Sequence, residues 1–406
     1  MSQGPDTLGK RGGYPVFPRP YYYWVSKETE QKKQSGGGHV KFRCDRDALS
    51  EALQTVQRGV SSRPGIPALT GVLIDAVAEG GLTLTTTDLE VSARLTIDVQ
   101  VTEPGTALIP ARLLGDTVKS LSDAPVDVEA DQSQARIRCA AYEGALRLLP
   151  AEDFPALQPP SGTRVVVEAQ RFAEAVGQVA RAASRDEARP VLTGVLVEIS
   201  REGVTLVATD SYRLAVREMI ATAGGEARAI VPERAMTEAG RASQAIEKGD
   251  IELFVDESQV SFQLGSLMLT SRLIEGEFPN YRQLLPEAYE SRLTVSRQQL
   301  IDAVRRVGLL ARDTSPVRME FNALGVKLSS QSPDLGQAVE AVEARYEGED
   351  VTAAFNPHYL ADGLAAASGE TVRLEVRDGL KPGIVRGETD EFTYLVMPVR
   401  LPTPVG

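Results

Sequence analysis

Cysteine and histidine are scarce in this chain of 406 residues. The two cysteines, Cys44 and Cys139, and the two histidines, His39 and His358, form no CxxC pair and no Cys/His cluster. This pattern excludes a disulfide framework and the common kinds of zinc site. We therefore expect no metal and no cofactor, and we interpret both cysteines as small buried hydrophobic residues.

Long apolar runs are also missing. No stretch approaches the roughly 18 consecutive apolar residues of a membrane-spanning helix, and the N-terminus lacks the basic, apolar and small-residue progression of a signal peptide. Hydrophobic residues make up 42% and charged residues 25% of the chain, as is ordinary for a globular protein. These features predict a cytoplasmic protein without a membrane partner.

Short catalytic motifs are absent as well. The chain contains no HExxH, GxSxG or GxGxxG sequence, and no Ser/His/Asp or Cys/His set can be assembled around its two histidines. We therefore predict no catalytic residues and no enzymatic activity. Paired carboxylates need no short motif, so a hydrolase or transferase with a carboxylate site stays open as an alternative.

The first residues, 1–39, differ from the rest of the chain. They contain three consecutive glycines, several prolines and the run Tyr21-Tyr22-Tyr23-Trp24 without periodicity. This composition predicts a disordered N-terminal extension. A native start near Val40 would also account for the change, and a full-length intact mass of the native protein would contradict that idea.

One pattern occurs three times in the remainder of the chain, at intervals of about 120 residues. Each copy opens with a short strand and an amphipathic helix, predicted around 49–56, 172–179 and 300–307. A second helix in each copy is predicted to carry a proline in its first turn, at Pro110, Pro232 and Pro357. Gly249 and Gly369 suit the ends of the last two of these helices.

Strand patterns fill the rest of each copy. Residues 67–73 match residues 190–196 as strands, and the following strands end in Thr87-Asp88 and Thr209-Asp210. We predict an α+β fold of three repeated domains, each a sheet with two helices on one side, over 40–160, 162–288 and 291–406. Triplication favours a scaffold, since active sites are rarely repeated three times.

Positive charge is concentrated on the predicted helices, although the formal net charge is −12. Arginines that recur on equivalent helices would give one surface sequence-independent affinity for phosphates. Each arginine alone is also typical of the outer face of an amphipathic helix, so the prediction depends on the repetition.

Four motifs together resemble the bacterial sliding clamp family, the beta subunit of the replicative DNA polymerase. They are Arg63-Pro64 with Ile66-Pro67, the run from Thr209 to Ala215, the run from Glu277 to Tyr281, and the run from Tyr394 to Leu401. The resemblance implies a DNA-clamp fold and a processivity factor that encircles double-stranded DNA. It implies a head-to-tail homodimer that closes a ring, with helices lining the hole and antiparallel sheets outside.

The resemblance also implies a hydrophobic cleft that binds short peptide motifs of the replicative polymerase, the clamp loader and repair polymerases. Its residues would be Leu192, Thr209, Arg213, Leu214, Pro279, Leu284, Tyr359, Leu395, Val396, Met397, Pro398, Val399 and Arg400. The family often has Gly-His where this chain has Ser211-Tyr212. This departure predicts an altered peptide preference in a cleft that is retained.

Two further sets of residues follow from the arginine pattern and the resemblance. The residues expected to face DNA are Arg63, Arg185, Arg189, Arg234, Arg241 and Arg305. Leu113 and Leu114 are expected to meet Leu309 and Leu310 of a second copy across the dimer interface, and the alternative is that all four belong to the core. A ring or arc scaffold unrelated to DNA stays open as a second alternative, and it predicts no basic lining.

Overall fold

The computed structural model describes residues 39–60, 65–285, 289–311 and 316–400. Apart from His39, the predicted N-terminal extension lies outside these residues, and so does Arg63. The described residues group into two compact units. One contains the described residues up to Gln170 together with Arg241–Arg272, and the other contains Arg171–Gly240 together with those from Leu273 onward.

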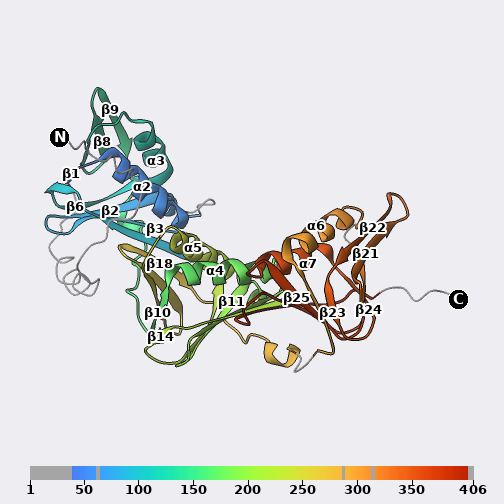
Figure 1. Cartoon of the computed structure of the whole chain (residues 1–406). Helices are drawn as coiled ribbons and strands as arrows, with labels where there is room; N and C mark the ends of the chain where they lie inside the picture. The colour runs from blue at the N-terminus through green and yellow to red at the C-terminus, as the bar shows by residue number, and fades with distance from the viewer. Residues whose placement is uncertain (1–38, 61–64, 286–288, 312–315, 401–406) are drawn as a thin grey trace, which may run out of the picture. The chain divides into compact units, whose positions relative to one another are not determined.

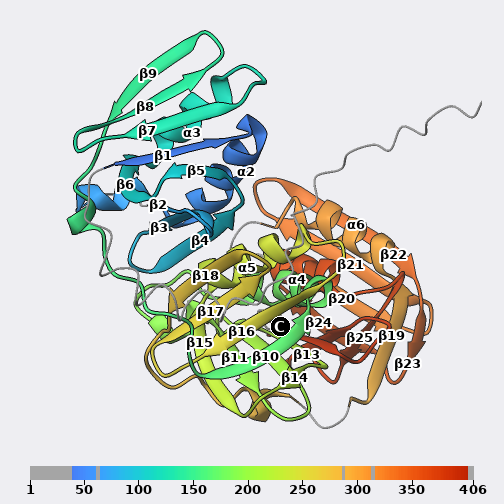
Figure 2. The same cartoon turned by 90° about the vertical axis from the view of Figure 1, so that its left-hand side faces the viewer.

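The first unit contains two antiparallel sheets. The strand orders are β5-β1-β7-β8-β9 and β10-β16-β17-β18-β4-β3-β2-β6. Figure 2 shows β9, β8, β7 and β1 side by side. The elements are β1 Val40–Cys44, α2 Arg46–Val56, β2 Gly71–Val77, β3 Gly81–Thr87, β4 Val91–Ile97, β5 Gln100–Glu103, β6 Gly105–Pro110, α3 Ala111–Ser120, β7 Val126–Ala130, β8 Gln134–Cys139, β9 Tyr142–Arg147, β10 Thr163–Glu168, β16 Asp250–Val255, β17 Gln259–Leu264 and β18 Leu267–Arg272.

The second unit also contains two antiparallel sheets, in the orders β15-β11-β12-β13-β27-β26-β25-β19-β23 and β22-β21-β20-β24. Figure 1 shows α6 and α7 side by side, and the two helices pack against each other. The elements are β11 Gly194–Ile199, β12 Val204–Thr209, β13 Arg213–Met219, β14 Thr222–Ala223, β15 Ala227–Pro232, β19 Ser291–Ser296, α6 Arg297–Gly308, β20 Val317–Asn322, β21 Gly325–Ser332, β22 Gly336–Glu343, β23 Arg345–Glu347, β24 Val351–Phe355, α7 Pro357–Ala366, β25 Thr371–Val376, β26 Gly383–Arg386 and β27 Phe392–Val396.

The predicted first helix of each repeat is confirmed. The three helices are α2, α4 (Ala169–Val179) and α6, and each turns an apolar stripe inward. Asp45 caps α2, because its Oδ1 accepts hydrogen bonds from the N–H groups of Asp47 (2.9 Å) and Ala48 (3.1 Å). Leu49 and Leu300 are buried on the inner faces of α2 and α6.

The second helices begin differently from the prediction in two of the three repeats. Pro357 does begin α7, behind the N-cap Asn356. Pro110, however, is the last residue of β6 and the N-cap of α3, and Pro232 is the last residue of β15, before α5 (Glu233–Gln244). A proline without an N–H suits the end of a strand as well as the start of a helix.

The starts of two predicted strands and two glycines predicted at helix ends lie in turns instead. The apolar runs that were predicted as strands begin with the 3-10 turns Pro67–Thr70 and Pro190–Leu192, and the strands β2 and β11 start only afterwards. Gly249 and Gly369 lie several residues beyond the ends of α5 and α7. Both have positive φ, at 147° and 91°, so they serve the turns into the next strands.

Strand pairing crosses the boundaries between the sequence repeats. β4 of the first repeat pairs with β18 of the second, with Ala93 opposite Leu269. β13 of the second repeat pairs with β27 of the third, with Leu214 opposite Leu395. The second repeat is therefore shared between the two compact units, which is why three repeats give two units.

Both cysteines are buried, as expected. Burial, with the neighbouring carboxylates of Asp45 and Asp127, raises the pKa of the Cys44 thiol to about 12. Within the described residues, no helix is both long and apolar enough to cross a membrane.

Candidate functional site

The last strand that the structure describes joins the second and third repeats. β27 lies between β13 and β26, and Ala215 of β13 is opposite Tyr394 of β27. Beyond the strand, the Met397 N–H donates a hydrogen bond to the Tyr212 carbonyl oxygen (2.9 Å). The Val399 N–H donates to the Ala354 carbonyl oxygen (2.7 Å). The segment after β27 is therefore fixed at one end to the β12–β13 turn and at the other to β24.

Side-chain hydrogen bonds stabilise the β12–β13 turn in an unfavourable backbone conformation. The Thr209 hydroxyl accepts a hydrogen bond from the Ser211 N–H (3.1 Å) and donates one to the Arg213 carbonyl oxygen (2.6 Å). Asp210 Oδ1 accepts from the N–H groups of Tyr212 (2.9 Å) and Arg213 (3.0 Å). Ser211 has a φ of 78°, which is unfavourable for a residue with a side chain. The hydrogen bonds offset this cost.

The first repeat has the same turn. Thr87 accepts from the Leu89 N–H, and Asp88 accepts from the N–H groups of Glu90 and Val91, at distances of 2.8 to 3.1 Å. Leu89 has a φ of 77°. The first repeat has Glu90 and Val91 where the second repeat has Tyr212 and Arg213. It therefore forms the same turn but lacks the tyrosine and the arginine of the candidate site.

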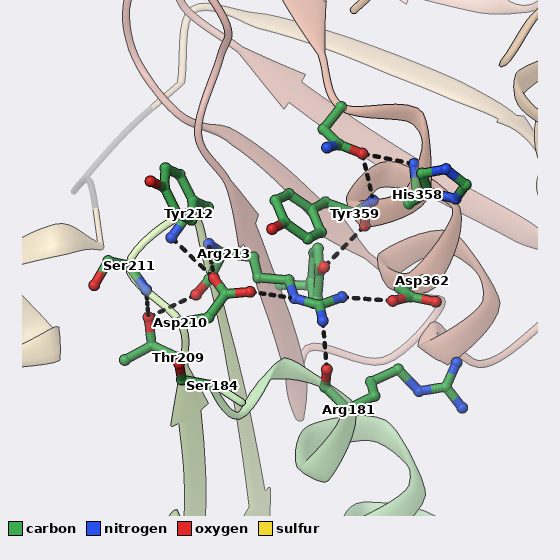
Figure 3. Close-up of polar contacts among 12 residues, drawn as sticks. Arg181, Ser184, Thr209, Asp210, Ser211, Tyr212, Arg213, His358, Tyr359 and Asp362 are labelled. Carbon is green, nitrogen blue, oxygen red and sulfur yellow. Dashed lines mark hydrogen bonds and ion pairs between the residues drawn. The ribbon is translucent and has the colours of Figure 1, made fainter. Parts of the chain in front are cut away.

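Arg213 is the centre of the site (Figure 3). Its side chain is only 11% exposed and lies between groups from the second and third repeats. Nε donates to Asp210 Oδ2 (3.0 Å), Nη1 donates to Asp362 Oδ2, and Nη2 donates to the Arg181 carbonyl oxygen (2.6 Å). Burial alone would lower the pKa of the guanidinium, but Tyr394, Asp362 and Asp210 raise it. Arg213 therefore stays charged, and its Nε, Nη1 and Nη2 atoms all donate hydrogen bonds.

Aromatic rings surround this guanidinium. Arg213 Cζ lies 4.6 Å from the centroid of the Tyr359 ring, in a cation–π contact. The Tyr212 ring stacks on the Tyr359 ring at 6.2 Å and 20° (Figure 3). The Tyr394 hydroxyl donates to the Tyr359 carbonyl oxygen (2.8 Å), and burial raises the pKa of Tyr359. These contacts fix the orientation of Tyr359.

An apolar cluster includes residues of β13 and β27. Its buried members are Leu196, Val207, Leu214, Val216, Ile230, Phe278, Tyr281, Ile384 and Leu395. Three large apolar or aromatic side chains on neighbouring segments remain exposed: Tyr212, Leu284 and Met397. The site thus combines a rigid polar centre with exposed apolar surface, which suits binding of an apolar ligand held by a few polar groups.

Apart from Arg213, the predicted cleft residues fall into two groups. Those at the surface are Tyr359, Pro398 and Val399, which are half-buried, and Pro279, Leu284, Met397 and Arg400, which are exposed. Leu192, Thr209, Leu214, Leu395 and Val396 are buried instead. Leu214, Leu395 and Val396 lie on β13 and β27 inside a sheet, whereas Leu192 ends a 3-10 turn and Thr209 ends β12.

Three residues of the site were not predicted from the sequence as site residues: Asp210, Tyr212 and Asp362. Asp210 follows Thr209 in a repeated Thr-Asp pair, so the repeat itself carried a signal for it. Tyr212 was noted only as a departure from the family pattern. Asp362 has no signal in the sequence, since it meets Arg213 across 149 positions of the chain.

The arginines expected to face DNA are exposed wherever the structure describes them. Arg185 and Arg189 lie on the loop after α4, Arg234 and Arg241 lie on α5, and Arg305 lies on α6. Arg189 is engaged with neighbours, because its Nε donates to Asp186 Oδ2 (2.9 Å) and its Nη1 donates to Ser211 Oγ (3.0 Å).

The leucines expected at a dimer interface differ in exposure. Leu309 is 80% exposed, Leu113 is also exposed, and Leu310 is half-buried. Leu114 does not meet the expectation. It is 1% exposed because it lies on the inner side of α3, so it belongs to the core of its own unit.

A pocket of about 510 Å³ lies elsewhere in the second unit, and its lining includes four acidic residues, Glu290, Glu349, Asp350 and Asp378, together with Arg377. Asp378 Oδ1 accepts hydrogen bonds from the Leu380 and Lys381 N–H groups (2.7 and 2.8 Å). This carboxylate thus closes a turn.

Comparison with known proteins identifies the family. Residues 40–158, 166–280 and 282–400 match the N-terminal, central and C-terminal domains of the DNA polymerase III beta subunit. This chain belongs to the beta sliding clamp family. The beta sliding clamp of Streptomyces coelicolor is 38% identical over 379 residues, which cover 89% of this chain and 100% of that protein. The beta sliding clamp of Bacillus subtilis is 30% identical, with the same coverage.

Solved clamps share the fold. The sliding clamp of Bacillus subtilis has a TM-score of 0.85 at 28% identity, covering 90% of this chain and 100% of that one. A Pseudomonas aeruginosa clamp bound to griselimycin has a TM-score of 0.85 at 29% identity, with the same coverage. The predicted three-domain clamp fold with antiparallel sheets is confirmed.

Membership in the beta sliding clamp family also decides between the functions that the sequence left open. The beta sliding clamps are non-catalytic processivity factors of DNA polymerase III, and this chain is one of them. The alternatives of a hydrolase or transferase and of a scaffold unrelated to DNA are therefore wrong.

Proposed function

We propose that this clamp tethers its partners by binding short peptide segments at the surface around Tyr212, Tyr359 and Met397. The observation that carries the proposal is the Arg213 network, which joins two repeats and holds Tyr359 beside exposed apolar side chains. The partners are the replicative polymerase, the clamp loader and repair polymerases.

The chemistry of the surface fits peptide binding. Exposed Leu284 and Met397 offer apolar contacts, and Met397 adapts to different side chains because it is unbranched and polarizable. Clamps of Pseudomonas aeruginosa and Bartonella birtlesii have been solved with griselimycin bound, and griselimycin is the probe that we propose for this surface. Tethering then raises the local concentration of a weakly bound polymerase at its site of action.

Truncation after Val396 tests this proposal, because it keeps β27 and removes the surface segment Met397–Arg400 together with all residues after it. Burial of one methionine side chain contributes about 1.5 kcal/mol or more, so griselimycin affinity should fall about tenfold or more. Isothermal titration calorimetry measures the affinity. The control is Arg345→Ala, which removes an exposed ion pair with Glu347 and should bind like the parent. Equal affinity of the truncated and parent chains would reject the site.

We further propose that two copies assemble head to tail into a ring. β9 ends one sheet of the first unit and β22 ends one sheet of the second, so each leaves an edge for pairing with another strand. Exposed Leu113 and Leu309 add apolar contacts. A contact between two different surfaces closes only when the rotation between copies completes a circle. Domains over 40–160, 162–288 and 291–406 would make six in the closed ring.

The ring encircles double-stranded DNA in the cytoplasm without reading its sequence. Exposed arginines attract phosphates, namely Arg185 on the loop after α4, Arg234 and Arg241 on α5, and Arg305 on α6. Because the formal net charge is −12, DNA is repelled from the remaining acidic surface. Binding is thus topological, and the basic residues guide the duplex without fixing it in place.

A further inference from the structure

Arg189 was expected to face DNA, but its guanidinium is directed at the β12–β13 turn. Nε donates a hydrogen bond to Asp186 Oδ2 (2.9 Å), and Nη1 donates to Ser211 Oγ (3.0 Å). Ser211 directly precedes Tyr212, whose ring stacks on Tyr359 in the proposed peptide site. An arginine outside the site is thus connected to its aromatic surface through one hydroxyl group.

The segment that carries Arg189 is itself firmly built. The Ser184 N–H donates to the Leu192 carbonyl oxygen (2.8 Å), and the Leu192 N–H donates to the Arg189 carbonyl oxygen (3.0 Å). The Asp186 carboxylate accepts a hydrogen bond from the Ala188 N–H (3.1 Å). The guanidinium is therefore presented from a fixed backbone, as a positioning role requires.

Ser211 is a position where an anchor matters. Its left-handed backbone is unfavourable for serine, and Tyr212 beside it is exposed to solvent on part of its surface. The Tyr212 carbonyl oxygen accepts the Met397 N–H (2.9 Å). A displacement of Ser211 would therefore shift both the Tyr212 ring and the segment that begins at Met397.

The first repeat shows that the polar pair is not needed to form the turn. Ile66 precedes Pro67 as Arg189 precedes Pro190, and Leu89 occupies the position of Ser211 with nearly the same φ, 77° against 78°. Ile66 and Leu89 are apolar and 45% and 42% exposed. The same backbone therefore forms without an arginine-to-hydroxyl hydrogen bond, and the pair in the second repeat has a role beyond the turn.

We propose that Arg189 is a positioning residue of the peptide site, which holds Tyr212 against Tyr359 through Ser211 so that the apolar side chain of a bound peptide meets a preformed aromatic surface. This inference rests on the proposed peptide-binding function. It assigns the Arg189–Ser211 pair to peptide affinity and removes Arg189 from the set of residues that contact DNA.

A double-mutant cycle on the full chain tests the inference, with griselimycin as the probe. Loss of one hydrogen bond predicts that Arg189→Ala and Ser211→Ala each bind about three- to tenfold more weakly. The double variant should be no weaker than either single variant, because both remove the same contact. Arg345→Ala, which lacks any contact with this turn, is the matched control and should bind like the parent.

A charge-conserving variant separates positioning from DNA contact. Arg189→Lys keeps the positive charge but loses the planar guanidinium that donates to Asp186 and Ser211 at the same time. It should therefore bind griselimycin nearly as weakly as Arg189→Ala. All Arg189 variants should keep the parent's residence time on nicked circular DNA. Thermal unfolding checks that the Ser211→Ala chain is folded; if it is not, the Arg189 variants decide alone.

Two outcomes would overturn the inference in different ways. Parental griselimycin affinity in Arg189→Ala, or a shortened DNA residence that Arg189→Lys restores, would reject it and leave the peptide site intact. Failure of the parent chain to bind griselimycin would reject the proposed peptide site, and the inference with it.

Discussion

Arg213 shows how a single residue can join two repeats. A guanidinium that is 11% exposed is stable only when its donors are satisfied, and here two carboxylates and one carbonyl oxygen accept them. The residue therefore organises the candidate site. Tyr359, held by the cation–π contact, presents the surface.

Asp362→Asn is expected to weaken this network. The amide keeps the shape but loses the negative charge beside Arg213, and Asp362 is partly exposed, so the loss of unfolding free energy should be about 1 kcal/mol. Urea denaturation measures it. Glu347→Gln, whose ion pair with Arg345 is exposed on both sides, should stay within about 0.5 kcal/mol of the parent. Equal unfolding free energies of the two variants would show that the Asp362–Arg213 ion pair does not stabilise the fold.

The sequence predicted part of the site at this scale. Thr209, Arg213 and Tyr359 are in the site, because their motifs are local or lie at a helix start. Burial could not be read from the same motifs: Leu214 and Leu395 face each other within a sheet. Pairing between positions so far apart in the chain depends on tertiary structure alone, so Asp362 was missed too.

At the scale of elements, periodicity predicted the helices better than their limits. The apolar stripes of α2, α4 and α6 identify those helices directly. The prolines at 110 and 232 were assigned one position too far into the helix, because the same residue type suits the end of a strand. The insertion of β27 between β13 and β26 leaves no mark in the local pattern.

Contact between α7 and β27 depends on a glycine. A Cβ on Gly363 would lie 2.3 Å from the Tyr394 ring, which is fully buried and cannot move aside. Gly363→Ala should therefore destabilise the chain, by about 1–3 kcal/mol as for other overpacked cores. The matched control is Gly115→Ala on α3, where a Cβ meets nothing within 4 Å.

The control should be neutral or stabilising, by up to about 1 kcal/mol, because alanine favours the helix. Both variants are compared with the parent by thermal unfolding. A Gly363→Ala chain as stable as the Gly115→Ala chain would contradict the close packing of α7 on β27.

For the whole molecule, the sequence predicted three similar domains because the repeat is visible in the residues themselves. It did not predict that the second repeat is shared between two compact units. That result depends on two strand pairings, β4 with β18 and β13 with β27, which link residues far apart along the chain. Motif spacing carries no information about such pairings.

The proposed dimer gives a direct test of assembly. Leu309→Asp introduces a charge where an exposed leucine is expected to meet a second copy, so the variant should sediment as a monomer at concentrations where the parent is a dimer. Analytical ultracentrifugation distinguishes the two masses. Leu380→Asp alters another highly exposed leucine, on the loop between β25 and β26, and should remain dimeric. A dimeric Leu309→Asp chain would move the interface elsewhere.

The central claim is that this clamp holds DNA by encircling it. The most direct measurement loads the chain onto nicked circular DNA with its clamp loader and ATP, and then follows the bound fraction after the circle is cut once. A ring that is free to slide leaves the ends of the linear product, so the account predicts loss of the bound protein on cutting and retention on the uncut circle. Protein that stays on the linear DNA would contradict topological binding.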